Sequence, residues 1–133
     1  MSTRTLPRAA VLLALAAAVA AAPACRSASN RAGQQTFASA EDAAKTMVEV
    51  ARTGTLDELM KILGPEAQPL VDASDPATAR QHRQVFVVAA AEGWRLEDHD
   101  SGGRVLVVGH ESWPFPVPIV TDANRWRFDT AAG

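Results

Sequence analysis

Apolar residues recur at helical spacing in three stretches of the chain. Each stretch begins after a residue that favours helix N-termini (Ser, Thr or Asp) and ends at a glycine, which favours helix C-termini. The sequence therefore predicts about three helices and, between the second and the third, a proline-punctuated loop. The helices are expected at residues 39–54, 55–64 and 75–93, and the loop at 66–74.

The apolar stripe of each predicted helix indicates which side chains the fold should bury. The first stripe consists mainly of alanine, and such small side chains favour close packing of the helix on a sheet. The residues expected to face the core are Ala43, Ala44, Met47, Val48 and Ala51 in the first helix, Leu56, Leu59, Met60, Ile62 and Leu63 in the second, Leu70 and Val71 in the loop, and Ala79, Phe86, Val87 and Ala90 in the third.

From Trp94 onward the apolar pattern changes to alternation and β-branched runs, which are typical of strands. Turn-forming residues separate four such segments. The second segment is apolar on both faces, so we expect it at the centre of a sheet. The whole pattern predicts an α+β domain, in which the helices pack on an antiparallel sheet of about four strands at residues 94–97, 104–108, 117–121 and 125–128.

The stretch before the third predicted strand has prolines at every second position. Pro114, Pro116 and Pro118 lack the amide donor on the same side of an extended chain. This pattern predicts an edge strand, or a polyproline-like approach to one, that pairs on one side at most.

Residues 1–24 have the pattern of a secretory signal peptide. Arg4 and Arg8 precede an uninterrupted apolar run at 9–22, and small residues follow it. The apolar run is shorter than the roughly 20 residues that span a bilayer. We therefore expect an exported protein.

Cys25, the single cysteine of the chain, directly follows this segment. The preceding Ala22-Pro23-Ala24 resembles the lipobox of bacterial lipoproteins, which predicts a lipid on Cys25 and a place in the periplasm or at the outer membrane. An intermolecular disulfide or a free thiol in a soluble secreted protein are the alternatives. The polar residues 25–35 predict a flexible tether to a small domain at 36–133.

The net charge narrows the class of partner. The chain has 13 Lys+Arg and 15 Asp+Glu, and removal of residues 1–24 takes away Arg4 and Arg8 but no acid, leaving a net charge of about −4. Because nucleic-acid-binding surfaces are basic, nucleic acid is not an expected partner. The expected partners are the membrane, through the lipid, and another envelope protein or a second copy of the chain.

Residues suited to catalysis or metal binding are few. His110 and Glu111, beside Trp113, are the best candidate acid–base pair, and a solvated loop is the alternative interpretation. The segment Asp98–Asp100 favours a polar turn over a metal site, because neighbouring side chains at a strand end diverge. We therefore expect no catalytic residue, no metal and no cofactor, and the protein is more simply explained without an enzymatic activity.

The aromatic residues of the C-terminal quarter have two interpretations. Trp113, Phe115 and Trp126 either belong to the core and its rim or form an exposed groove that binds a partner.

Several blocks of the mature chain together resemble the bacterial envelope family called domain of unknown function 2950. The resemblance covers residues 34–133 and is carried above all by the Trp-Pro-Phe-Pro block at 113–116 and the Trp-Arg-Phe-Asp-Thr-Ala-Ala-Gly block at 126–133. Members of that family usually continue into a further helix-rich half, so the resemblance implies that this chain is truncated and corresponds to the first half. It implies kinship and an envelope location but no catalytic residues.

Three classes of function remain open. The leading hypothesis is a non-enzymatic exported lipoprotein that displays a small α+β domain. The second is an interaction module that pairs through an apolar sheet face with itself or with another envelope protein. The third is a small ligand-binding or enzymatic domain of the cone-shaped kind, in which helices and a curved sheet enclose a pocket. This third hypothesis rests on the order of the elements alone.

Overall fold

The computed structural model describes residues 33–100 and 102–133; the predicted signal peptide, Cys25 and most of the predicted tether lie outside the described residues. In the described part, four α-helices precede a five-stranded antiparallel sheet, which confirms the predicted α+β class. The helices are α2 (Ala40–Thr53), α3 (Leu56–Leu63), α4 (Gln68–Ala73) and α5 (Pro76–Glu92), with 3₁₀ turns η1 (Pro65–Ala67) and η2 (Thr130–Ala132). The strands are β1 (Trp94–Asp98), β2 (Arg104–Val108), β3 (Trp113–Pro114), β4 (Ile119–Asp122) and β5 (Arg125–Phe128).

The capping residues identified in the sequence act as caps. The Ser39 hydroxyl accepts a hydrogen bond from a backbone amide of the first turn of α2. Thr55 and Glu58 form the predicted capping box of α3. The Asp75 carboxylate accepts two backbone amides of α5, each at 3.0 Å. Because a cap satisfies amides that the helix cannot, local sequence alone determines where these three helices begin.

The predicted loop at 66–74 is wrong, because the chain is helical there. The turn η1 and the helix α4 occupy this segment, and their prolines stand in the first turns, where a missing amide costs no hydrogen bond. The predicted anchor Leu70 is 63% exposed. Helix α4 therefore contributes little to the core.

Strand β2 is central, as predicted. Strand β1 pairs along one of its edges, and β3 and β4 share the other, with β5 beyond β4. The edge strand predicted from the prolines is β3, which pairs with β2 at Val107 and Val108. The amide of Phe115 then donates to the carbonyl of Leu106 at 2.7 Å before the chain leaves the pairing.

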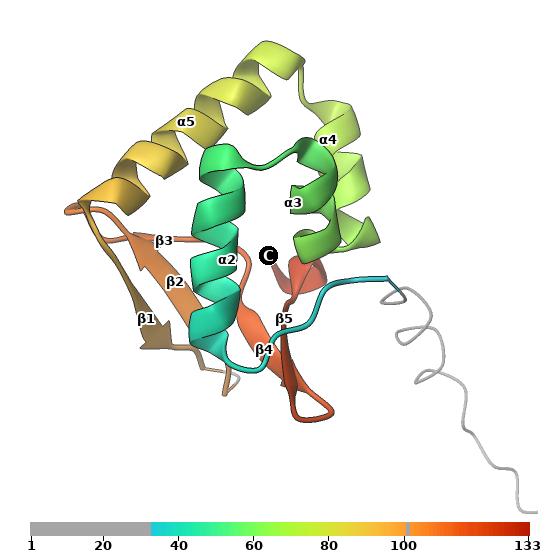
Figure 1. Cartoon of the computed structure of the whole chain (residues 1–133), viewed down its shortest axis with the longest axis vertical. Helices are drawn as coiled ribbons and strands as arrows, with labels where there is room; N and C mark the ends of the chain where they lie inside the picture. The colour runs from blue at the N-terminus through green and yellow to red at the C-terminus, as the bar shows by residue number, and fades with distance from the viewer. Residues whose placement is uncertain (1–32, 101) are drawn as a thin grey trace, which may run out of the picture.

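One face of the sheet carries the hydrophobic core. In Figure 1, α2 crosses this face, with α3 and α4 beside it. The side chains of Leu106, Ile119 and Phe128 are fully buried, and Ala43 and Ala44 on α2 are equally inaccessible. Since alanine has no side chain beyond Cβ, α2 approaches the sheet closely, as its stripe predicted.

Three residues predicted to face the core are exposed: Leu56, Leu70 and Ala79. All three lie in the first turns of their helices. Figure 1 shows that the first turns of α3 and α5 lie at the end of the molecule farthest from the sheet. Helical spacing identifies the stripe correctly but does not tell where along the helix the covering layer ends.

Arg83 joins α5 to α2. Its guanidinium donates to the carbonyls of Val50 (3.0 Å), Ala51 (2.6 Å) and Gly54, at the C-terminal end of α2. The Val50 carbonyl also accepts the amide of Gly54 at 2.8 Å, and the Arg83 cation suits the negative end of the helix dipole. Arg83 therefore holds the two helices together from the side away from the sheet.

The N-terminal segment of the described chain is hydrogen-bonded both to the helical layer and to the sheet. The Gln34 side chain donates to the carbonyls of Ile62 (3.0 Å) and Phe128 (2.8 Å). Phe37 exchanges two backbone hydrogen bonds with Trp126 and extends the sheet beyond β5. Among residues 33–100 and 102–133, no helix is long and apolar enough to cross a membrane.

Candidate functional site

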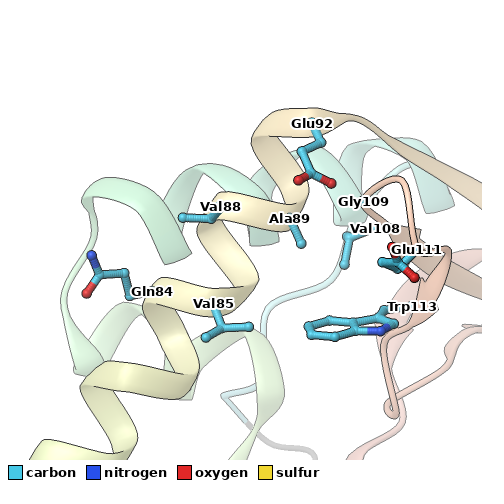
Figure 2. Close-up of a pocket in the computed structure, with 9 residues that line it drawn as sticks. All are labelled: Gln84, Val85, Val88, Ala89, Glu92, Val108, Gly109, Glu111 and Trp113. Carbon is cyan, nitrogen blue, oxygen red and sulfur yellow. The ribbon is translucent and has the colours of Figure 1, made fainter.

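A hollow of about 270 Å³ lies between α5 and the segment that joins β2 to β3. Figure 2 shows its lining: α5 forms one wall, and the turn after β2 together with Trp113 forms the other. The lining residues are Gln84, Val85, Val88, Ala89, Glu92, Val108, Gly109, Glu111 and Trp113.

A second hollow, of about 200 Å³, continues the first along α5. The two share Val85, Val108 and Trp113, so the apolar surface runs from one into the other. The second hollow is completed by His82, Phe86, Pro114, Phe115 and Pro116. We refer to the two hollows together as the α5–β3 groove.

The sequence of α5 explains why this surface is open. Residues 85–91 are apolar at every position, so they form more apolar surface than one packed face can cover. Phe86 and Ala90 face the core. Val85 is left 42% exposed and Val88 58% exposed.

Trp113 forms the opposite wall of the groove and is 51% exposed. It follows Ser112, a non-glycine residue with a left-handed φ of 56°. The left-handed residue ends the turn that begins at Gly109, and β3 starts there. An indole with one apolar face and a polar N–H is typical of interface contacts.

The end of the groove near Gly109 is acidic, because Glu92 and Glu111 both line it. Glu92 Oε2 accepts the backbone amide of His110 at 2.8 Å and lies 3.7 Å from the His110 Nδ1 atom. Gly109 has a φ of 78°, and a Cβ there would lie only 3.1 Å from the Glu92 carboxylate. The close contact of the turn with α5 therefore depends on this glycine.

The structure brings two of the three predicted aromatic residues together. Trp113 and Phe115 both line the second hollow. Phe115 is half-buried, with its ring centroid 5.5 Å from that of Phe86 and 6.1 Å from that of Phe128. Trp126 is half-buried on β5 and lines neither hollow of the groove. Phe115 is therefore the floor of the groove, and Trp126 belongs to a different part of the molecule.

The two residues of the candidate acid–base pair, His110 and Glu111, lie in different surroundings. Glu111 lines the first hollow, whereas the His110 side chain is 82% exposed and faces Glu92 from outside. No group of three or more His, Cys, Asp or Glu residues in the described ranges is placed to hold a metal ion. The predicted lipidation site, Cys25, lies outside the described residues.

Sequence reasoning missed Val85, Val88 and Glu92 as parts of this surface. Val85 and Val88 belong to a predicted helix whose core-facing stripe runs through Phe86, Val87 and Ala90. The available signal was the uninterrupted apolar run at 85–91, which is wider than one helical stripe. Glu92 gave no signal, because only the fold places it beside Glu111.

Residues 34–133 match the model of a protein family described as protein of unknown function (DUF2950). The chain belongs to this family. No curated protein and no solved structure matches the chain. The match begins at Gln34, whose side chain donates to carbonyls of α3 and β5, and it spans all the helices and strands of the described residues. The DUF2950 description names no activity, and the groove has to be interpreted from its own chemistry.

Proposed function

We propose that this protein is an exported envelope lipoprotein, anchored through Cys25, whose α+β domain binds a partner polypeptide in the α5–β3 groove. The export and anchoring part rests on the sequence pattern of residues 1–25. The binding part rests on one observation: three large apolar side chains, Val85, Val88 and Trp113, are about half exposed around a continuous hollow. Contiguous exposed apolar surface is costly in water and marks interaction sites.

The position of the groove changes the interaction hypothesis drawn from the sequence. The apolar face of the sheet is covered by helices, with Leu106, Ile119 and Phe128 fully buried. Val85, Val88 and Trp113 are instead exposed together where α5 meets β3. Binding is therefore proposed at the helix edge of the domain and not across the sheet face.

Binding suits the chemistry of the groove better than catalysis does. Its walls are aliphatic and aromatic, and the ionisable groups that line the first hollow are the carboxylates of Glu92 and Glu111. Glu92 already accepts a backbone amide. Apolar walls of this kind stabilise a complex by burying apolar side chains of a partner, whereas a catalytic site needs several polar groups that converge on one point.

Anchoring is tested by labelling cells that express the full chain with radioactive palmitate. The expected result is a labelled protein that fractionates with membranes, and loss of both properties in Cys25→Ala. Ser27→Ala, two residues away in the predicted tether, is the matched control and should retain the label. Label that persists in Cys25→Ala would overturn the anchoring proposal.

Binding is tested by placing a photoreactive amino acid at position 88 of the full chain and irradiating intact cells. The expected result is a discrete adduct with one polypeptide, identified by mass spectrometry, that disappears when Trp113→Ala is added. The same photoreactive residue at Leu70, which is exposed on α4, is the control and should give no such adduct. Equal adducts from positions 88 and 70 would contradict a binding role for the groove.

A further inference from the structure

We propose that the segment bound in the α5–β3 groove presents an apolar side chain followed by a lysine or arginine, whose cation lies between Glu92 and Glu111. This inference rests on the proposed function, since it specifies the partner of the same groove. Three properties of the groove carry it: its shape, the charge at one end, and the way that charge is held.

The shape of the groove suits a short stretch of polypeptide. Two hollows that share Val85, Val108 and Trp113 lie in sequence along α5, so two neighbouring side chains of one segment can occupy them. The walls at this shared region are apolar, and one wall is the exposed indole of Trp113. Burial of aliphatic or aromatic side chains there removes apolar surface from water on both partners.

The charge differs between the two ends of the first hollow. Figure 2 shows Glu92 and Glu111 at the Gly109 end and Gln84 at the other end of the lining stretch of α5. In the part of the chain that the structure describes, no Lys or Arg pairs with either carboxylate; Glu92 has His110 as its neighbour. Two carboxylates without a cationic partner beside an apolar hollow attract a cation.

The Glu92 carboxylate is held in place before any partner arrives. Its Oε2 atom accepts the His110 amide at 2.8 Å, and the absence of a side chain at Gly109 leaves room for it. A pre-positioned carboxylate costs less conformational entropy on binding than a freely rotating one. The acidic end therefore favours a cation at a defined distance from the apolar side chain.

The same charge argues against the two other occupants of such a surface. Membrane surfaces that carry anionic lipids have a negative potential, and Glu92 and Glu111 would oppose the approach of the groove to them. A second copy that used the same patch about a two-fold axis would bring its own Glu92 and Glu111 to the interface. A basic polypeptide segment is the occupant whose charge complements the groove.

The test uses an array of nine-residue peptides probed with the labelled full-length chain. Each peptide has two leucines at varied spacing, followed by lysine, glutamine or glutamate in an otherwise Ser/Gly background. The strongest peptide is then measured in solution by fluorescence anisotropy at low and high salt. We expect the lysine peptides to bind about three- to tenfold more tightly than the matched glutamine peptides, because two partly exposed ion pairs contribute on that scale.

Variants separate the two parts of the site. Glu92→Gln with Glu111→Gln should abolish the preference for lysine over glutamine, and with it the salt dependence, while leucine-dependent binding remains. The control is Glu41→Gln with Asp57→Asn, which removes two exposed carboxylates elsewhere and should leave the lysine preference intact. Trp113→Ala, or Val88→Ala if the first variant folds poorly, should weaken all peptides alike.

The outcomes distinguish this inference from the proposed function. Peptide binding that depends on Trp113 but is equal for lysine, glutamine and glutamate would overturn the inference and leave the proposed function standing. Absence of Trp113-dependent binding for every peptide would overturn both. A Trp113-dependent dimer in sedimentation of the full chain, or Trp113-dependent binding of phosphatidylglycerol vesicles, would assign the groove to a second copy or to a membrane and would likewise overturn the inference.

Discussion

Helices α2 and α5 are both rich in small apolar residues, yet they end up in opposite situations. Helix α2 has one alanine-rich stripe, and the fold covers it, with Met47 2% exposed and Ala44 fully buried. Helix α5 is apolar on every side over residues 85–91. The fold covers one side of it, through Phe86 and Ala90, and leaves Val85 and Val88 exposed.

The difference shows how a small domain separates stability from binding. An apolar stripe that matches one packed face, as in α2, is fully buried when the protein folds. Apolar surface beyond that face, as in α5, stays exposed and can contact a partner. Helix α5 keeps its position despite the surplus, because Arg83 ties it to the carbonyls that end α2. The following predictions test this separation, from the largest expected effect to the smallest.

The largest effect is expected where α2 meets the core. Met47→Ala should lower the free energy of unfolding by about 2–5 kcal/mol, because it removes a buried side chain and leaves a cavity. Denaturant unfolding followed by circular dichroism measures the change. A loss below about 1 kcal/mol would mean that α2 packs less tightly than the burial of Met47 indicates.

A smaller effect is expected at the turn beside the groove. Gly109→Ala should cost about 1–2 kcal/mol for the left-handed backbone alone, and more because its Cβ would lie 3.1 Å from Ala89 Cβ and from Glu92. Gly102→Ala is the matched control: it has a similar φ of 81° but nothing within 4 Å of the added Cβ. The difference in stability loss between the two variants, measured by thermal unfolding, gives the contribution of the contact with α5. Equal losses would show that the turn does not pack closely against the helix.

The carboxylate that caps α5 predicts that the protein is less stable in acid. The hydroxyl and amide of Thr78 hold the pKa of Asp75 below its ordinary value of 3.8. A group whose pKa is lower in the folded state contributes stability above its unfolded pKa and loses it as the pH falls through the folded pKa. The melting temperature of the wild type should therefore fall as the pH is lowered below about 4. Asp75→Asn, which keeps an oxygen acceptor, should show a smaller fall over the same pH range. Identical pH profiles for the two proteins would contradict the cap as a source of this dependence.

The smallest effect on stability is expected at the groove itself. Val88→Ala should change the free energy of unfolding by no more than about 0.5 kcal/mol, since the side chain is 58% exposed. The same change should weaken binding of the leucine–lysine peptides severalfold. Chemical denaturation and peptide titration on one sample test both statements. A large loss of stability would show that Val88 belongs to the core after all.

Much of the fold follows from local chemistry that the sequence displays. The caps Ser39, Thr55 and Asp75 each satisfy amides within a few residues, so the starts of α2, α3 and α5 could be predicted. The change of period at Trp94 and the apolar run at 104–108 identified the strands and the central position of β2. These features depend on interactions between residues close in sequence, so local sequence was sufficient to predict them.

The errors lie where local signals were ambiguous or where distance along an element mattered. The prolines near α4 favour a loop by composition, although proline in a first helical turn is compatible with a helix. Leu56 and Ala79 follow the correct helical phase but are exposed, because they belong to the first turns of α3 and α5, which lie far from the sheet in Figure 1. Periodicity gives the direction of a side chain and not the extent of what covers it.

The sequence by itself determined the helix ends, the strand segments, the family resemblance and the pattern typical of an exported protein, because each is encoded in short stretches. Only the tertiary structure decided that Trp113 stands across from Val85 and Val88, and that Glu111 joins Glu92 at one end of the same hollow. The physical reason is that the groove is what remains after packing: it is the apolar surface of α5 that one small sheet is too narrow to cover. This exposed surface depends on how the helices and the sheet pack together, so no single stretch of sequence predicts it.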